Sequence, residues 1–192
     1  MISEKVINRA ELLRNTTAYQ KILQNKIFII PTDTVYGISC DATSTRLVKK
    51  VRKIKHCKQP FSVIAPTKKW IRDNCIVNSK VEKWLKKLPG PFTLVLKLKN
   101  KNVISKEVYN RENNTLGVRI PDHWITDVVK KINIPLITTT ANVHGKNYMT
   151  YIDNLDPEIR NKVDLIISVG IKRGHPSTII HIDDEEKIIK RK

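Results

Sequence analysis

The chain has 192 residues, of which 40% are hydrophobic and 28% charged, and this composition suits one globular domain spanning 1–192. Its longest clean apolar stretch, residues 27–30, is far too short to cross a bilayer, and its N-terminus lacks the apolar core of a signal peptide. We therefore expect a cytoplasmic protein without a membrane partner. Lys and Arg number 36 against 18 Asp and Glu, and the resulting net charge of +18 favours partners that carry phosphate.

Apolar periodicity predicts strands interleaved with helices along the whole chain. This rhythm is typical of an α/β domain built on a twisted, mixed sheet. In chain order, the pattern predicts two helices within 4–25, a strand at 26–30, a helix at 44–55, a strand at 61–65, one or two helices within 68–88, strands at 92–99 and 116–120, a helix at 124–132, and strands at 136–140, 165–169 and 178–182.

The three cysteines indicate neither a disulfide framework nor a zinc site. They are odd in number and widely spaced, and no C-x-x-C pair is present. Five scattered histidines add no ligand pattern, so the sequence leaves any metal site unknown.

Polar residues gather where the predicted strands end rather than within the helices. Loops at strand ends of an open α/β sheet converge on a crevice, which is where such sheets bind ligands. We therefore expect one site to be lined by five segments: PTDTVYG (31–37), KIKHCKQP (53–60), GVRIPDH (117–123), TTTANVHG (138–145) and HPST (175–178).

Several of these side chains suit a small amino acid. Thr32 offers a hydroxyl that both donates and accepts, and Tyr36 offers an aromatic wall with a polar tip. The planar guanidinium of Arg119 can grip a carboxylate through two hydrogen bonds, although it could also pair with Asp122 at the surface. Ser177 could close the pocket with a further hydroxyl.

Other residues of these segments suit an anion. Lys53 and Lys55 would point apart on a continuing helix, but from a loop both could face one phosphate group. Thr140 and Asn142 occupy alternate positions of extended backbone and would face the same side. We find no nucleophile with a base beside it, so covalent catalysis is not expected. The residues alone indicate a basic α/β domain with an anion-binding crevice.

The motifs, in their order, resemble the YrdC-like family of threonylcarbamoyl-adenylate synthases. The resemblance runs from about residue 27 to residue 191, nearly the whole chain. It is carried by PTDTVYGISCDA, KIKHCKQPFSVIA, LPGPFTLVL, TLGVRIPDH, TAN at 140–142 and PSTII.

This resemblance implies an open, twisted sheet with flanking helices around a large basic cleft, as in YrdC/RibB-like folds. The implied reaction condenses L-threonine, bicarbonate and ATP, with Mg²⁺ accompanying ATP and no prosthetic group. Its product would pass to a tRNA-modifying transferase. By motif, the threonine-binding residues would be Thr32, Tyr36, Arg119, Thr140 and Ser177, and the ATP-binding residues would be Lys53, Lys55, Thr115, Asn142, Thr150 and Arg191.

The chain departs from the family pattern in three places. Lys55 stands where the family has Arg, which keeps the charge but loses the planar fork. Thr140 replaces the Ser of the family's S-A-N motif and adds a methyl group. The sequence ends just past Arg191, without the extra C-terminal domain of longer members, so Arg191 is expected on an unsupported tail.

Two other functions stay open from the sequence. A non-enzymatic module that binds tRNA or double-stranded RNA would also need a basic cleft. The high content of Lys, Ile and Asn, which AT-rich codons encode, is an alternative explanation for most of the excess charge and needs no such partner. Related domains also serve carbamoyl transfer in hydrogenase maturation, but the acylphosphatase-like and zinc-finger segments that accompany them are not found in this sequence.

Overall fold

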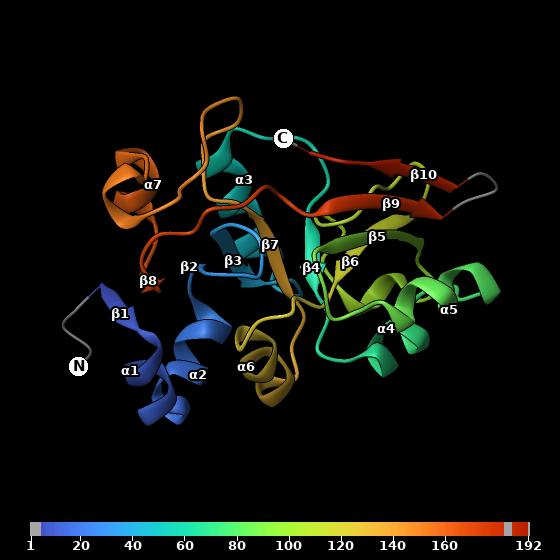
Figure 1. Cartoon of the computed structure of the whole chain (residues 1–192), viewed down its shortest axis with the longest axis horizontal. Coiled ribbons are helices and arrows are strands. Elements are labelled where there is room, and N and C mark those ends of the chain that lie inside the picture. The colour runs from blue at the N-terminus through green and yellow to red at the C-terminus, as the bar shows by residue number, and fades with distance from the viewer. Residues whose placement is uncertain (1–4, 183–185, 192) are drawn as a thin grey trace.

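A single twisted sheet with helices packed on both faces organises the chain in the computed structural model (Figure 1). The structure describes residues 5–182 and 186–191. Within them ten strands pair in the order β1-β8-β2-β3-β7-β4-β6-β5-β9-β10, which mixes parallel and antiparallel neighbours and confirms the predicted mixed α/β sheet. The strands are β1 (Val6–Asn8), β2 (Phe28–Ile30), β3 (Gly37–Asp41), β4 (Ser62–Ile64), β5 (Phe92–Lys97), β6 (Thr115–Arg119), β7 (Leu136–Thr140), β8 (Leu165–Ser168), β9 (Thr178–Ile182) and β10 (Glu186–Ile189).

Capping residues mark where most of the helices begin. The side chains of Ser44, Thr67 and Asn78 each accept a hydrogen bond from the backbone N–H three residues on, which satisfies a donor that the first helical turn leaves free. None of the helices in the described part of the chain has the length and apolarity needed to span a bilayer. The α-helices are α1 (Arg9–Arg14), α2 (Thr16–Asn25), α3 (Thr45–Lys55), α4 (Lys68–Asn74), α5 (Ser79–Lys86), α6 (Ile125–Ile132) and α7 (Pro157–Lys162), and short 3₁₀ turns lie at Lys101–Val103 and Ile152–Asn154.

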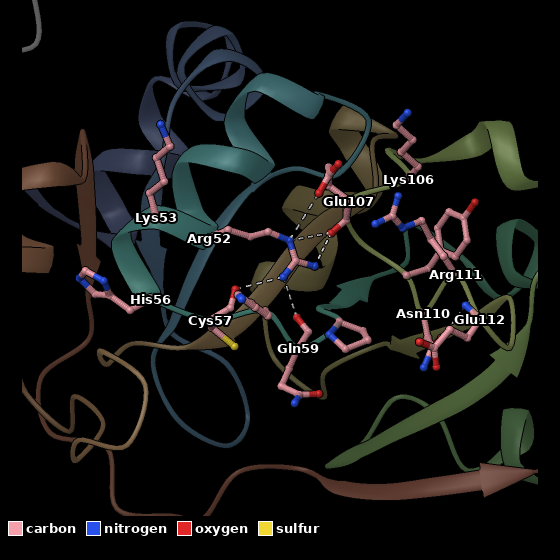
Figure 2. A pocket seen from close by; sticks show the side chains of 13 residues that line it. Arg52, Lys53, His56, Cys57, Gln59, Lys106, Glu107, Asn110, Arg111 and Glu112 are labelled. Atoms are coloured by element: carbon pink, nitrogen blue, oxygen red, sulfur yellow. Dashed lines mark hydrogen bonds and ion pairs between the residues drawn. The ribbon is translucent and has the colours of Figure 1, made fainter.

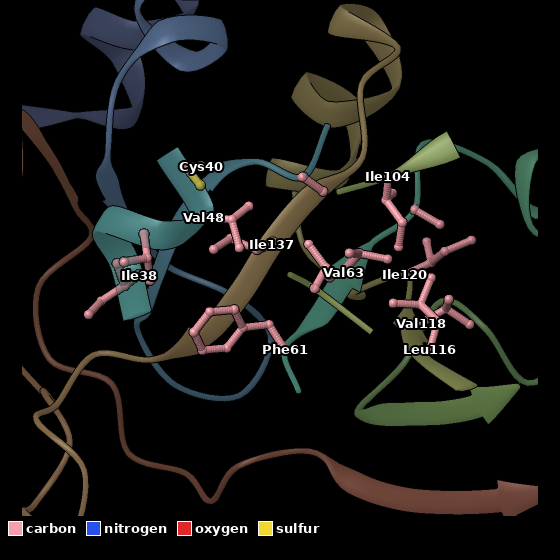
Figure 3. Close-up of a cluster of buried hydrophobic side chains, with 14 of the residues drawn as sticks. Ile38, Cys40, Val48, Phe61, Val63, Ile104, Leu116, Val118, Ile120 and Ile137 are labelled. Carbon is pink, nitrogen blue, oxygen red and sulfur yellow. The ribbon is translucent and has the colours of Figure 1, made fainter. Parts of the chain in front are cut away.

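The larger of two apolar cores fills one face of the sheet. Figure 3 shows Val48 of α3 beside Ile38 of β3 and Ile137 of β7, all fully buried. Farther along the sheet, Val63 of β4 and Val118 of β6 are direct neighbours in the parallel pairing of these strands. This core therefore spans strands that are distant in sequence and holds the centre of the sheet together.

The second core covers only part of the opposite face. It includes Leu23 of α2 and Val129 of α6, which pack over Phe28 of β2 and Leu136 of β7. Figure 1 shows α1, α2 and α6 grouped near the β1 end of the sheet. This core reaches β4 through Ile64 and includes no described residue of β5, β6 or β9. The helical cover of this face therefore stops in the middle of the sheet.

Small polar residues take over on this face where the cover stops. The register places Thr138 of β7 opposite Ser62 of β4, and Ser62 opposite Gly117 of β6, so the three lie in one row across the sheet. A Cβ atom on Gly117 would lie 2.7 Å from the Ser62 hydroxyl, so the strands need glycine there. Thr140 and Arg119 follow on the same face, two residues farther along their strands.

The structure departs from the predicted elements mainly near the N-terminus and in short strands. Val6–Asn8, predicted as helical, forms the edge strand β1, because it pairs with Leu165–Ser168 of β8. Gly37–Asp41, most of which lies outside every predicted element, forms strand β3. The predictions also lack α7 and β10, both of which are short. The stretch 68–88, predicted to hold one or two helices, holds two, α4 and α5.

Replacement of Ile137 by alanine tests the importance of the larger core. Ile137 is fully buried at the centre of β7, so Ile137→Ala should lower the free energy of unfolding by about 2–5 kcal/mol through lost burial and a cavity. Urea unfolding followed by circular dichroism measures this loss. Ile76→Ala is the matched control, because Ile76 is 53% exposed and should change stability by less than about 0.5 kcal/mol. Equal losses for both variants would contradict the described core.

Candidate active site

The five polar segments meet at one small cavity on the open face of the sheet. Its volume is about 150 Å³. Pockets for drug-sized ligands are larger, roughly 300–1,000 Å³, so this one suits a molecule the size of an amino acid. Thr138 and Ser62 contribute from the middle of the sheet, so the segments meet over its face rather than only at strand ends. Each segment provides at least one lining residue, among them Thr32, Pro60, Arg119, Thr140 and Ser177.

A buried ion pair links two of these segments. The Arg119 side chain is 6% exposed, and its Nη2 pairs with Oδ1 of Asp33, whose side chain is 9% exposed. Arg119 Nη1 donates to Thr34 Oγ1 at 3.3 Å, and Asp33 Oδ2 accepts the Asp122 backbone N–H at 3.0 Å. Burial lowers the pKa of Arg119, and the Asp33 carboxylate acts in the opposite direction. Arg119 therefore pairs with Asp33 and not with the Asp122 carboxylate considered from the sequence.

Arg119 keeps donors that these contacts do not use. A guanidinium has five N–H groups, and the two contacts above occupy only Nη1 and Nη2. Arg119 Nε is buried and finds no hydrogen-bond partner within residues 5–182 and 186–191. An unpaired buried donor costs about 1–3 kcal/mol, more for a charged group. A ligand oxygen that accepted from Nε itself would remove that cost.

Hydroxyl groups of the loop before β3 form a chain that begins at Arg119. The Thr34 hydroxyl lies 2.9 Å from the Thr32 hydroxyl, and Thr32 donates to the Val35 carbonyl at 2.8 Å. Thr32 donates its only hydroxyl proton to Val35, so Thr34 is the donor in the hydrogen bond between the two hydroxyls. Thr34 can then accept from Arg119. The ion pair and the hydroxyls thus fix the shape of this loop together.

A second arginine, Arg191, lines the same cavity. Ser177 is 1% exposed, and its hydroxyl lies 2.6 Å from that of Thr93 on β5. Arg191 donates to the Ser177 hydroxyl at 2.7 Å and to its carbonyl at 2.8 Å. Burial lowers the pKa of Arg191, and the nearby Arg119 lowers it further, so the two cations create a position that favours an anion. The expectation of an unsupported tail is wrong, because the antiparallel pairing of β10 with β9 and the contacts with Ser177 hold Arg191.

Three predicted residues lie at or beside the cavity, but their polar atoms form hydrogen bonds with other parts of the protein. The Tyr36 hydroxyl donates to the Gly170 carbonyl at 2.7 Å and accepts the Val169 N–H at 2.9 Å, so its polar tip stabilises the fold. Lys55 is 3% exposed and directs its ammonium to the backbone of residues 140–142. Asn142 contacts the same ammonium and does not line the cavity.

Three further predicted residues lie farther away. Thr115 is at the opposite end of β6 from Arg119, where it pairs with Asn110. The Thr150 hydroxyl accepts from the Asn154 side chain at 2.7 Å. Lys53 lines a separate, larger groove, because α3 continues through Lys55 and turns the two lysines in different directions. Of the eleven predicted residues, the cavity is lined by Thr32, Tyr36, Arg119, Thr140, Ser177 and Arg191.

The larger groove adjoins the cavity at Pro60, which lines both. Its volume is about 1110 Å³. Figure 2 shows Arg52 at its centre, where the guanidinium donates to the carbonyls of Cys57 at 3.1 Å, Gln59 at 3.0 Å and Glu107 at 3.0 Å. These contacts tie the loop after α3 to the segment before β6. The loop therefore has a defined shape.

Cations outnumber acids along the groove. The cations are Arg52, Lys53, Lys58, Lys106 and Arg111, against Glu107 and Glu112, and His56 contacts Glu158 of α7 at 2.9 Å. This surface suits a polyphosphate. A single large basic cleft, as the resemblance implies, stays a prediction.

Asp33, Thr93 and Arg52 are site residues that the sequence reasoning missed. Asp33 lies within the PTDTVYG motif, and the Thr in LPGPFTLVL is Thr93, so position within a motif was the available signal. Arg52 falls on the outer face of a predicted helix and gave no signal. In the described ranges, no group of three or more His, Cys, Asp or Glu side chains is placed to hold a metal ion.

The fold and the cavity define an α/β domain that combines an amino-acid-sized polar pocket with an adjoining basic groove. A profile of the Sua5/YciO/YrdC family, described as "Telomere recombination", matches residues 20–192, and the chain belongs to this family.

Two relatives and one solved structure show the extent of the similarity. A Methanocaldococcus jannaschii protein that carries the provisional name of threonylcarbamoyl-AMP synthase is 38% identical over 176 residues, or 88% of this chain and 80% of its own. The threonylcarbamoyl-AMP synthase of Pseudoalteromonas atlantica is 28% identical over 170 residues, or 83% of this chain and 87% of its own. The fold is similar to P. abyssi Sua5 in complex with L-threonine, with a TM-score of 0.82 and 23% identity over 95% of this chain and 56% of that one. This chain thus spans little more than half of the Sua5 chain.

Breaking the buried ion pair should cost considerable stability. Asp33→Leu would leave the Arg119 charge buried without its carboxylate and should lower the free energy of unfolding by about 3–5 kcal/mol. Adding Arg119→Met should restore part of that loss, because the unpaired charge is then removed as well. Urea unfolding of the single and double variants measures both effects.

Asp73→Leu is the control for this experiment. Asp73 forms an exposed ion pair with Lys69 on α4 and should change stability by at most about 1 kcal/mol. Similar small losses at positions 33 and 73 would show that the buried pair does not stabilise the loop.

Proposed function

We propose that the chain is an L-threonylcarbamoyladenylate synthase, which condenses L-threonine, bicarbonate and ATP to threonylcarbamoyl-AMP and pyrophosphate. One observation carries this proposal: a buried arginine with an unpartnered Nε, within the described chain, lines a cavity sized for an amino acid. The names of the two relatives support the same reaction. The product would serve the threonylcarbamoyladenosine modification of tRNA.

Threonine occupies the small cavity in this proposal. Its carboxylate accepts from the remaining N–H groups of Arg119, which suits the planar fork of a guanidinium. Thr140 and Ser177 offer hydroxyl oxygens to the rest of the molecule, whereas Thr32, whose hydroxyl is bonded to Val35 and Thr34, contributes to the wall of the cavity. The pocket's limited volume supports a short side chain.

ATP occupies the adjoining groove, with its phosphates toward the cavity. Arg191 lies on the cavity side and Lys53 in the groove, so both could approach the triphosphate. Mg²⁺ would enter with ATP, bound largely by phosphate oxygens and water, and would neutralise phosphate charge. Thr115, Asn142 and Thr150 stay predicted nucleotide contacts by motif.

The chemistry needs positioning more than covalent participation. The threonine amine forms a C–N bond to bicarbonate with loss of water, and an oxygen of the resulting carbamate attacks the α-phosphorus of ATP. The bond from the α-phosphorus to the bridging oxygen breaks, and pyrophosphate leaves. Orientation of the reactants and neutralisation of developing charge can supply most of the rate enhancement. Exclusion of water from the cavity, once threonine and ATP fill the cavity and the groove, would also protect the carbamate. A tRNA-modifying transferase in the cytoplasm would then consume the adenylate.

Pyrophosphate release tests the proposal directly. Purified protein with ATP, Mg²⁺ and bicarbonate should release pyrophosphate only when L-threonine is added. Serine should support the reaction less well, by about 10–200-fold, since a missing methyl group is worth that much in a fitted pocket. Threonine-independent binding of duplex RNA that weakens steeply with salt, without pyrophosphate release, would favour an RNA-binding module instead.

Arg119→Ala should lower the threonine-dependent release of pyrophosphate by about 10²-fold, because the carboxylate loses the contact that orients it. The assay measures initial rates at saturating ATP, with threonine varied. Arg14→Ala on the exposed surface of α1 is the control and should retain full activity. Unchanged activity of Arg119→Ala would remove Arg119 from the site.

A further inference from the structure

Lys55 is the last residue of α3, and its charge is buried. The residue is 3% exposed, although lysine is rarely buried unless paired. Its Nζ donates to the carbonyl oxygens of Thr140 at 2.6 Å and Asn142 at 2.8 Å, and to the Asn142 side-chain Oδ1 at 3.0 Å. An ammonium has three protons, and these three acceptors use all of them. No donor is then left for a phosphate group.

The contacts of Asn142 determine the orientation of its side-chain amide. Oδ1 accepts from Lys55 at 3.0 Å and from the Thr140 hydroxyl at 2.6 Å. Nδ2 donates to the Lys146 carbonyl at 2.6 Å. A rotated amide would direct its NH₂ group at an ammonium, which can only donate, so Lys55 holds the amide in this orientation.

This orientation in turn determines what Thr140 offers to the cavity. The Thr140 hydroxyl has one proton, which it donates to Asn142 Oδ1. Thr140 lines the small cavity, so its hydroxyl oxygen meets a ligand there only as an acceptor. A partner that donates N–H groups is therefore favoured beside Thr140.

We propose that Lys55 is a positioning residue, which acts through Asn142 to present the Thr140 hydroxyl as an acceptor for the nitrogen of the bound amino acid. This inference rests on the proposed function and assigns Lys55 a different role from the phosphate contact that the family motif implies. The amine of threonine donates N–H before the reaction, and the carbamate nitrogen still carries one N–H afterwards. The same acceptor therefore serves both the substrate and the carbamate.

The protonation of Lys55 fits this role. Burial lowers its pKa to about 8, and the neighbouring Cys57 acts in the opposite direction. Near neutral pH the amine is therefore mostly protonated and can make all three contacts.

Binding measurements on matched variants test the inference. Titration calorimetry is applied to wild type, Lys55→Met, Thr140→Val and the double variant, with L-threonine and separately with a non-hydrolysable ATP analogue and Mg²⁺. Each single variant should weaken threonine about 10-fold, as for loss of one hydrogen bond to a charged group. The double variant should also lose about 10-fold rather than about 100-fold, because Lys55 acts through Thr140. The Kd of the ATP analogue should change less than about 3-fold throughout.

Two further variants serve as controls. Thr140→Ser keeps the hydroxyl and should retain threonine affinity within about 3-fold. Lys49→Met removes one exposed positive charge from the same helix and should change neither affinity. Weakening of the ATP analogue by Lys55→Met, or multiplying effects on threonine in the double variant, would overturn the inference.

Unfolding separates failure of this inference from failure of the proposed function. If wild type binds no threonine, the proposed function fails, and the network is still tested by urea unfolding of the same four proteins. Lys55 and Thr140 share Asn142 Oδ1, so the losses in stability should be clearly non-additive in the double variant. Additive losses would show that the three residues do not form a network.

Discussion

The buried ion pair between Arg119 and Asp33 is the contact on which the pocket depends. A guanidinium with a 6% exposed side chain is stable only beside a compensating carboxylate, and Asp33 also accepts the backbone N–H of Asp122. The loop before β3 is thereby held against the end of β6. This attachment also positions Thr34, which accepts from Arg119, and Thr32, whose hydroxyl bonds to that of Thr34. The ion pair that stabilises this loop thus leaves Arg119 Nε without a hydrogen-bond partner in the described chain.

The second constraint is the limited helical cover of one sheet face. Where α2 and α6 pack, the strands contribute large apolar side chains such as Phe28 and Leu136. Where that cover ends, the same face carries Thr138, Ser62 and Gly117 in one row. Apolar residues there would form an exposed patch, and larger ones would fill the cavity. The polar pocket is therefore a consequence of where the helices end, and Arg119 of the ion pair forms part of its wall.

Local patterns explain how much of the fold could be predicted. The strands Leu136–Thr140 and Thr178–Ile182 have the bounds expected from their β-branched residues. The three-residue strand Val6–Asn8 could not be recognised, because only its distant partner β8 distinguishes it from the start of a helix. Gly37–Asp41 alternates apolar residues with glycine and serine, which weakens the strand signal.

The site was predictable at the level of segments but less so at the level of contacts. The five polar segments do meet, and six of the predicted side chains line the cavity. The partner of Arg119 lies 86 residues away, and the sequence offers several carboxylates of equal merit. Lysine is usually exposed, so nothing local showed that the end of α3 brings Lys55 to the carbonyls of residues 140–142. Contacts between polar residues that are distant in sequence could be identified only from the three-dimensional structure.

A crystal structure of the protein with L-threonine would test the central claim most directly. The account predicts one threonine in the small cavity, with its carboxylate within hydrogen-bonding distance of Arg119 and the Arg119–Asp33 pair intact. Threonine bound elsewhere, or bound in the cavity with its carboxylate directed away from Arg119, would contradict it.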